Sequence, residues 1–172
     1  MTTKISLERL NTLDQSDFAA VLGGIFEGPP WIVTEAWAAR PFSAIDDLYD
    51  ALCQAMYAAP KERKVALIQA HPDLVGRAAR TGTLGSASTA EQAAAGLNDL
   101  TAGEIATFER LNAEYQQRFG FPFVICAREN KKDSILAGFR ARQAHSREQE
   151  IAAALREVSK IVWLRLVDRV TE

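Results

Sequence analysis

The stretch that decides the fold is "TAGEIATFERLNAEYQQRF", residues 101–119. Its apolar side chains recur every three or four positions, at Ile105, Phe108, Leu111 and Tyr115, and mostly charged or polar residues lie between them. Because an α-helix turns once in about 3.6 residues, this spacing places the apolar side chains on one helical face. We therefore predict an amphipathic helix here, with its apolar face turned toward a core.

The same helical spacing extends over most of the chain on both sides of this stretch. Prolines and glycines separate the helical patterns, since proline cannot continue the hydrogen-bond ladder of a helix. The further predicted helices cover residues 16–28 with Ser16 as N-cap, 31–40, 43–59 with Ser43 as N-cap, 60–70 with Pro60 in the first turn, 88–100, 133–144 and 146–170. We predict an all-α fold, a helical bundle of about eight or nine helices that forms a single domain over residues 1–172.

One segment departs from the helical pattern. The stretch "GFPFVICA", residues 120–127, has extended character, and Pro122 prevents a regular ladder at its own position. Backbone groups of an isolated extended segment need partners, because an unpaired buried N–H or C=O is costly. Two interpretations stay open. The segment is a buried connector between helices, or it is a pocket wall whose main-chain groups from Phe123 to Ala127 face a small polar ligand.

Composition restricts the class of protein. The 172 residues are 48% hydrophobic and 24% charged, with a formal net charge of −2 and a pI of about 5.8. These values are typical of a soluble globular protein, and no basic run supports nucleic-acid binding. No stretch is apolar enough to span a membrane, and Cys53 and Cys126 lack the spacing of a zinc site or a disulfide framework. We expect a soluble, cytoplasmic protein with no metal, nucleic-acid or membrane partner.

Two histidines occur in the chain, and His71 is the more informative one. Pro72 ends the helix predicted over residues 60–70, because the residue before a proline is pushed out of the helical region. The imidazole is therefore expected at a helix end. There it either caps the last carbonyl groups of the helix or serves as a proton donor or acceptor near neutral pH. His145 lies at a polar helix junction and is predicted to be solvated or capping.

The residues that follow His71 are rich in glycine. Residues 72–87, "PDLVGRAARTGTLGSA", are predicted to form a loop of a length that is often functional. Whether this loop closes over a ligand stays open.

The stretch "STAEQ", residues 88–92, has the pattern of a helix start. Ser88 and Glu91 have the spacing of a capping box, in which each side chain binds a backbone N–H of the first turn. A helix N-terminus also suits a carboxylate ligand, because its N–H groups are unpaired. Gln92 is not required by the capping box, so the sequence leaves both a structural and a functional role open for this stretch.

Three arginines, Arg156, Arg165 and Arg169, lie on the last predicted helix. Arg165 interrupts the apolar run "IVWLRLV", residues 161–167. A guanidinium in such surroundings needs an anionic partner, since burying an unpaired charge is costly.

Together and in this order, these stretches resemble the 2-oxo-4-hydroxy-4-carboxy-5-ureidoimidazoline (OHCU) decarboxylases of urate degradation. The resemblance implies an all-helical homodimer that needs no cofactor and converts OHCU to (S)-allantoin and CO2. The C-terminus lacks the peroxisomal signal of some members, which implies a cytoplasmic protein. The stretches that carry the resemblance are "LGGIFEGPPWIVTEAW" (22–37), "AHPDL" (70–74), "STAEQAAAGL" (88–97), "FGFPFVICA" (119–127) and "EVSKIVWLRL" (157–166).

The resemblance also implies which residues form the site. It gives catalytic roles to His71 and Glu91, and no metal ligand. The substrate-binding residues that it implies are Pro72, Ser88, Thr89, Ala90, Gln92, Phe123, Val124, Ile125, Cys126, Ala127 and Arg165. Arg156 and Arg169 remain alternatives to Arg165, because they lie on the same predicted helix.

The implied chemistry suits these residue types. Loss of CO2 leaves an electron pair, which the ring carbonyl next to the carboxylated carbon accepts as an enolate. The protein then orients the carboxylate, stabilises the enolate and protonates one face of the carbon. His71 suits the proton transfer, and Glu91 suits polarisation of a substrate hydroxyl or ureide N–H, although the division of roles stays open. The alternatives are another ureide-processing enzyme, such as a hydrolase, and a non-catalytic helical interaction module.

Overall fold

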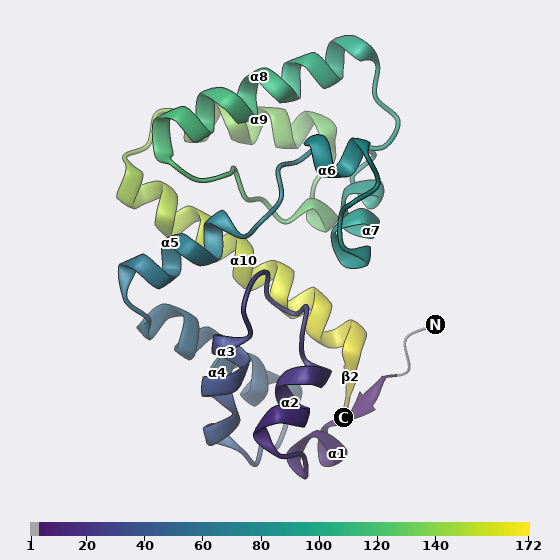
Figure 1. Ribbon diagram of the computed structural model, residues 1–172, viewed down its shortest axis with the longest axis vertical. Helices are drawn as coiled ribbons and strands as arrows, with labels where there is room; N and C mark the ends of the chain where they lie inside the picture. The colour runs from purple at the N-terminus through teal and green to yellow at the C-terminus, as the bar shows by residue number, and fades with distance from the viewer. Residues whose placement is uncertain (1–3) are drawn as a thin grey trace. The chain divides into compact units, whose positions relative to one another are not determined.

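A computed structural model describes residues 4–172, and its α-helices run from α1 to α10 (Figure 1). The predicted all-α fold class is confirmed. Contacts between residues divide the chain into two compact units. The first contains the residues up to Lys64 and Ser159–Glu172, and the second contains Val65–Val158. Helices α5 (Lys61–Gln69) and α10 (Arg147–Arg169) contribute residues to both units.

The first unit consists of short helices and a small sheet. Its elements are β1 (Ile5–Ser6), α1 (Leu7–Asn11), α2 (Gln15–Val21), α3 (Trp31–Ala36), the 3-10 helix η1 (Trp37–Ala39), α4 (Ile45–Ala58) and β2 (Val170–Thr171). Helix α3 packs against α2 and α4, and the core includes the fully buried side chains of Phe18, Leu48 and Leu52. The parallel pairing of β1 with β2 joins residues far apart in the sequence, and helical periodicity does not predict it.

Two helices of the first unit begin with a different cap from the predicted serine. Asp14, not Ser16, caps α2, and its carboxylate accepts a hydrogen bond from the backbone N–H of Asp17 at 2.8 Å. At the start of α4, the Asp47 carboxylate accepts a hydrogen bond from the backbone N–H of Ser43 at 2.9 Å. In both helices a carboxylate satisfies amides near the helix start, where its negative charge is also favourable.

The helix predicted over residues 16–28 is shorter than expected. Helix α2 ends at Val21, and Gly24 follows with a φ of +86°. Glycine enters this left-handed region without steric cost, so the chain turns there. Ile25 and Phe26 nevertheless remain buried, which explains why the apolar stripe continues beyond the end of the helix.

The second unit contains the helix that the opening stretch predicts. Its elements are α6 (Arg77–Arg80), α7 (Ser86–Ala94), α8 (Ala102–Phe119), the 3-10 helix η2 (Ala127–Glu129) and α9 (Lys132–Arg142), with parts of α5 and α10. Helix α8 packs against α9 (Figure 1) and buries Phe108, Leu111 and Tyr115, as predicted. Residues 121–126, which lead from the end of α8 to η2, form neither helix nor strand, in agreement with the predicted extended segment.

An aromatic cluster fixes that extended segment to the helices. The ring centroid of Tyr115 lies 4.5 Å from that of Phe119, 6.1 Å from Phe121, 5.3 Å from Phe123 and 6.2 Å from Phe139. Edge-to-face contacts at these distances add to the stabilisation from burial. The interpretation of the segment as a buried connector is therefore confirmed for Phe121 and Phe123.

A buried carboxylate lies next to this cluster. Glu150 is fully buried and accepts hydrogen bonds from the Tyr115 hydroxyl and from Arg142, at 2.8 Å for Nε of Arg142. Nδ1 of His145 lies 2.7 Å from the other carboxylate oxygen. Burial raises the pKa of Tyr115, and its hydrogen bond to Glu150 raises this pKa further. Arg142 also donates to the carbonyl of Val124 at 2.6 Å, so the network holds the extended segment.

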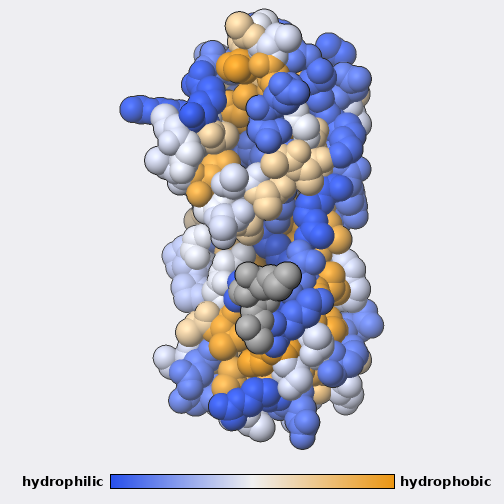
Figure 2. Space-filling view, turned by 90° about the vertical axis from the view of Figure 1, so that its right-hand side faces the viewer, coloured by the Kyte–Doolittle hydropathy of each residue, from blue (hydrophilic) through white to orange (hydrophobic). Residues whose placement is uncertain are grey.

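The surface of the chain mixes polar and apolar side chains. On the face drawn in Figure 2, hydrophilic side chains surround smaller hydrophobic areas. Within residues 4–172, none of the helices combines the length and the apolar character required to cross a membrane.

We expect the Glu150 network to contribute strongly to stability. Replacing Glu150 with alanine leaves the guanidinium of Arg142 without its buried anionic partner, so the free energy of unfolding should fall by about 3–5 kcal/mol. Urea denaturation followed by circular dichroism measures this change. The matched control is Glu114→Ala, which removes an exposed ion pair with Arg110 and should cost less than about 1 kcal/mol. Equal losses for the two variants would contradict the role given to Glu150.

Candidate active site

His71 lies at the end of α5, as predicted. Its backbone N–H donates to the carbonyl of Ile68 at 3.1 Å, and its side chain is buried, with 9% of the residue exposed. Nδ1 lies 2.8 Å from the carbonyl oxygen of Leu67. A carbonyl oxygen only accepts hydrogen bonds, so Nδ1 carries the proton of this bond. Nε2 is therefore the ring atom that gains or loses a proton, and the capping interpretation and the acid/base interpretation are compatible.

A pocket of about 340 Å³ lies beside His71. Its walls are formed by Gln69, His71, Pro72, Asp73, Gln116, Gly120, Phe121 and Pro122. Two hydrogen bonds cross between its walls, from Gln69 to the carbonyl of Gly120 at 3.0 Å and from Gln116 to the carboxylate of Asp73 at 2.7 Å. The end of α5 and the beginning of the extended segment therefore both form walls of this pocket.

The sequence did not single out Gln69, Asp73 or Gln116 as pocket residues. Gln116 lies on α8, far along the chain from His71, and its position beside Asp73 follows from tertiary packing. The one available signal for Asp73 was its place two residues after His71 in "AHPDL".

The loop predicted over residues 72–87 contains more structure than expected. Helix α6 forms within it, and α7 begins at Ser86. Val75 has a φ of +55°, which is uncommon for a β-branched residue because its side chain crowds the backbone there. Glycine spacing alone predicted a loop, whereas the alanine and arginine residues of Arg77–Arg80 form one helical turn.

The predicted capping box is wrong. Gly85 occupies the N-cap position of α7, so Ser88 is the third residue of the helix and Glu91 lies within it. Ser88 and Gln92 are both buried, with 7% of each residue exposed. Ser88 and Gln92 lie on one helical face, because residues four apart are neighbours on a helix.

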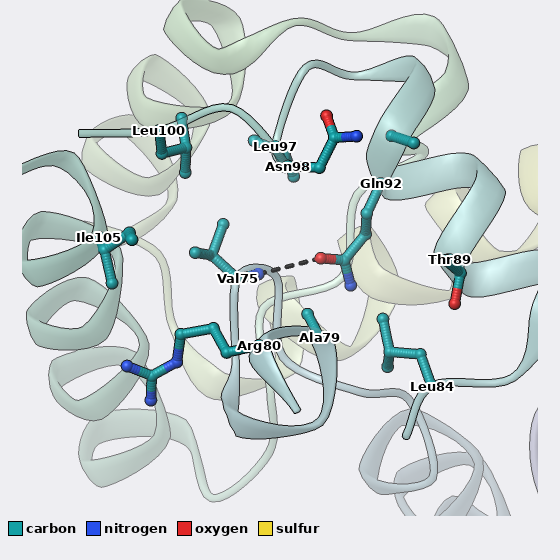
Figure 3. A pocket seen from close by; sticks show the side chains of 11 residues that line it. Val75, Ala79, Arg80, Leu84, Thr89, Gln92, Leu97, Asn98, Leu100 and Ile105 are labelled. Carbon is teal, nitrogen blue, oxygen red and sulfur yellow. Dashed lines mark hydrogen bonds between the residues drawn. The ribbon is translucent and has the colours of Figure 1, made fainter. Parts of the chain in front are cut away.

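Gln92 holds the chain just beyond His71. Its side-chain oxygen accepts a hydrogen bond from the backbone N–H of Val75 at 3.0 Å, and its side-chain nitrogen lies 3.3 Å from the carbonyl oxygen of Asp73. Figure 3 shows Gln92 reaching from α7 to Val75. The structure thus links the "STAEQ" stretch to the histidine segment, although Gln92 itself lines a different pocket.

That second pocket, of about 300 Å³, lies on the Val75 side of the same segment (Figure 3). Its lining is largely aliphatic and includes Val75, Leu84, Leu97, Leu100 and Ile105. Exposed Thr89 also lines it, with its hydroxyl donating to the carbonyl of Gly85 at 3.0 Å. The segment after Pro72 therefore contributes residues to two pockets, Asp73 to the first and Val75 to the second.

Helix α7, which carries Glu91, packs beside the end of the extended segment. Burial raises the pKa of the Cys126 thiol, and the carboxylates of Glu129, Glu157 and Glu91 raise it further. Helix α7 also contacts η2, which begins at Ala127. The structure thus brings two of the predicted site stretches together.

Part of the main chain that was expected to face a ligand has partners within the protein. The carbonyl of Val124 accepts from Arg142, and the N–H of Cys126 donates to the carboxylate of Glu157 at 2.9 Å. Asn130 donates to the carbonyl of Cys126 at 2.9 Å. Of the five residues from Phe123 to Ala127, Ile125 alone is partly exposed, so a ligand reaches this segment most readily there.

Arg165 belongs to the first unit. Its guanidinium is buried and donates to the carbonyl of Gly24 and to the carboxylate of Glu27, both at 3.0 Å. The predicted need for an anionic partner is confirmed. Of the two alternatives, Arg156 is exposed and Arg169 donates to the carbonyl of Val21 at 2.6 Å. The role of Arg165 in substrate binding stays a prediction.

Within the described part of the chain, no group of three or more His, Cys, Asp and Glu side chains is arranged to hold a metal ion.

Comparison with known proteins places the chain in a family. The OHCU decarboxylase family matches residues 11–167. A 2-oxo-4-hydroxy-4-carboxy-5-ureidoimidazoline decarboxylase of Haloferax volcanii is 40% identical over 166 residues, which cover 96% of each chain.

Two crystal structures show similar folds. The structure of an (S)-allantoin synthase is 28% identical, with a TM-score of 0.76 over 97% of this chain, which spans only 54% of that longer chain. The structure of an OHCU decarboxylase in the presence of (S)-allantoin has a TM-score of 0.70 and 17% identity, over 91% of this chain and 97% of that one. The sequence matches and the helical fold agree, and this chain belongs to the OHCU decarboxylase family.

Proposed function

We propose that this protein decarboxylates OHCU to (S)-allantoin and CO2 in urate degradation, with His71 as the acid that delivers the proton. The family match over residues 11–167 carries the proposal for the reaction. The hydrogen bond from Nδ1 of His71 to the carbonyl of Leu67 supports the proposal for the proton donor, because it leaves Nε2 as the titrating atom.

The reaction requires little beyond orientation and proton transfer. When the carboxylate leaves as CO2, its bonding electrons pass to the ring carbon and are delocalised onto the neighbouring carbonyl oxygen as an enolate. The proton on Nε2 of His71 then forms a bond to that carbon on one face, and the carbonyl is restored. A fixed imidazole makes the protonation stereospecific, because it reaches only one face of the bound enolate.

The remaining predicted residues have binding roles in this proposal. Glu91 accepts a hydrogen bond from a substrate hydroxyl or ureide N–H, and the contact of α7 with η2 supports a shared site with the end of the extended segment. Main-chain groups near Ile125 bind ureide or ring oxygens, and Arg165 binds a substrate anion. Pro72, Ser88, Thr89, Ala90 and Gln92 complete the proposed binding set.

Three further properties are part of the same proposal. The reaction needs no cofactor, because the substrate carbonyl accepts the electron pair. The protein acts as a homodimer in the cytoplasm, and both properties are proposed from the resemblance to the family. Light scattering of the purified protein tests the oligomeric state, and cell fractionation tests the location.

The central test of the activity uses freshly generated OHCU. We expect the protein to accelerate CO2 release and to produce a growing circular dichroism signal from a single allantoin enantiomer. Racemic allantoin formed at the uncatalysed rate would contradict the proposal and favour a non-catalytic module. Release of ammonia in place of CO2 would instead indicate a hydrolase.

The proposed role of His71 is tested by His71→Asn. The Asn side chain retains a donor in the position of Nδ1, so the bond to Leu67 is kept while the titrating Nε2 is lost. We expect the rate of decarboxylation to fall by about 10²–10⁴-fold, as for loss of a general acid, with an unchanged circular dichroism spectrum of the fold. The control, His145→Asn, removes the other histidine and should retain activity. A wild-type rate for His71→Asn would exclude His71 as the proton donor.

A further inference from the structure

The three residues after Pro72 are held by side-chain amides. The amide nitrogen of Asn112 donates to the carbonyl of Leu74 at 2.8 Å, and Gln92 accepts from the N–H of Val75 at 3.0 Å. Gln116, one helical turn beyond Asn112 on α8, donates to the side chain of Asp73 at 2.7 Å. Two helices, α7 and α8, thus hold consecutive residues of one short segment.

The backbone of Val75 is strained, and these hydrogen bonds restrain it. Its φ of +55° is a strained conformation for a β-branched residue and persists only where the surroundings impose it. The Val75 side chain is buried and lines the second pocket (Figure 3). The hydrogen bonds that Gln92 and Asn112 form with this segment oppose its relaxation to an unstrained conformation.

Asn112 differs from Gln92 and Gln116 in its surroundings. It is buried, with 6% of the residue exposed, and it lines neither of the two pockets described above. Its side-chain oxygen has no hydrogen-bond partner among the described residues. A buried amide with an unpaired oxygen costs stability relative to an apolar side chain, so packing alone does not account for Asn112 at this position.

We propose that Asn112 is a positioning residue for His71. Its hydrogen bond to Leu74, together with the hydrogen bond between Val75 and Gln92, fixes the strained segment of residues 73–75. Pro72 joins this segment to His71. This proposal rests on the proposed function of His71. Because the φ of Pro72 is fixed, rotation about that bond cannot absorb a displacement of residues 73–75, and more of the displacement passes to the backbone of His71. Misplacement of a catalytic group by about 1 Å is enough to reduce a rate about 100-fold.

The first test is Asn112→Leu, which keeps the side-chain volume but removes the donor. We expect kcat to fall about 10- to 100-fold while KM stays near the wild-type value, because Asn112 does not contact substrate. Amide hydrogen exchange at Val75 should become faster, because the segment opens more readily. The control is Phe108→Leu, a change in the core face of the same helix, which should destabilise the protein without lowering kcat.

The second test is Asn112→Asp, which restores the donor only when the carboxyl group is protonated. A protonated carboxyl donates its O–H to the carbonyl of Leu74, whereas a carboxylate repels that oxygen. Burial favours the neutral form, so its pKa should be raised. We expect kcat of this variant, relative to wild type at each pH, to recover as the pH is lowered. This variant also serves as the test if Asn112→Leu does not fold.

The outcomes separate the two proposals. Wild-type kcat in folded Asn112→Leu, or the absence of any recovery of Asn112→Asp at low pH, would overturn the positioning role. An equal loss of kcat in Phe108→Leu would also overturn it, because the effect would then be general destabilisation. If the wild-type protein itself does not decarboxylate OHCU, the proposed function fails, while hydrogen exchange at Val75 still reports whether Asn112 holds the segment.

Discussion

The hydrogen bond from Nδ1 of His71 to the carbonyl of Leu67 is the interaction on which the proposed site depends. It satisfies a carbonyl at the end of α5, and it also fixes the orientation of the ring and the identity of its titrating nitrogen. Pro72 ends the helix, so the imidazole is held at a helix terminus beside a pocket. One contact therefore serves both the fold and the proposed proton transfer.

The segments around the imidazole are irregular, and helices hold them through side chains. Arg142 illustrates this principle in the extended segment, because it binds both the buried Glu150 and the carbonyl of Val124. Gln92 and Asn112 act in the same way on the residues after Pro72. Functional groups on irregular segments gain precision when rigid elements supply such contacts. In this protein the cost is strain at Val75 and an incompletely paired amide at Asn112.

The sequence predicted the elements whose evidence is periodic. Helix α8 follows from the spacing of Phe108, Leu111 and Tyr115, and Pro72 marks the end of α5. Local patterns were less reliable where two structures satisfy them equally. The spacing of Ser88 and Glu91 fits a capping box, but it fits the interior of a helix as well, and the true helix start at Gly85 has no side-chain signal.

Contacts between residues far apart in the chain could not be predicted from the sequence. The anionic partner of Arg165 was predicted in kind, yet nothing in the run "IVWLRLV" identifies Glu27. The hydrogen bonds of Gln92, Asn112 and Gln116 to residues 73–75 depend on how α7 and α8 pack. His71, Glu91 and the extended segment were proposed as site residues from the resemblance, whereas the residues that hold them in place required the structure.

Nitrogen NMR of the imidazole rings shows directly which nitrogen of His71 carries the proton. With ¹⁵N-labelled histidine there are two rings to assign, and His145→Asn leaves His71 alone. Neutral His71 is expected to carry its proton on Nδ1, and Nε2 is expected to show the large shift change on titration. A neutral ring protonated on Nε2, with Nδ1 titrating, would contradict the bond to Leu67 and with it the assignment of Nε2 as the proton donor.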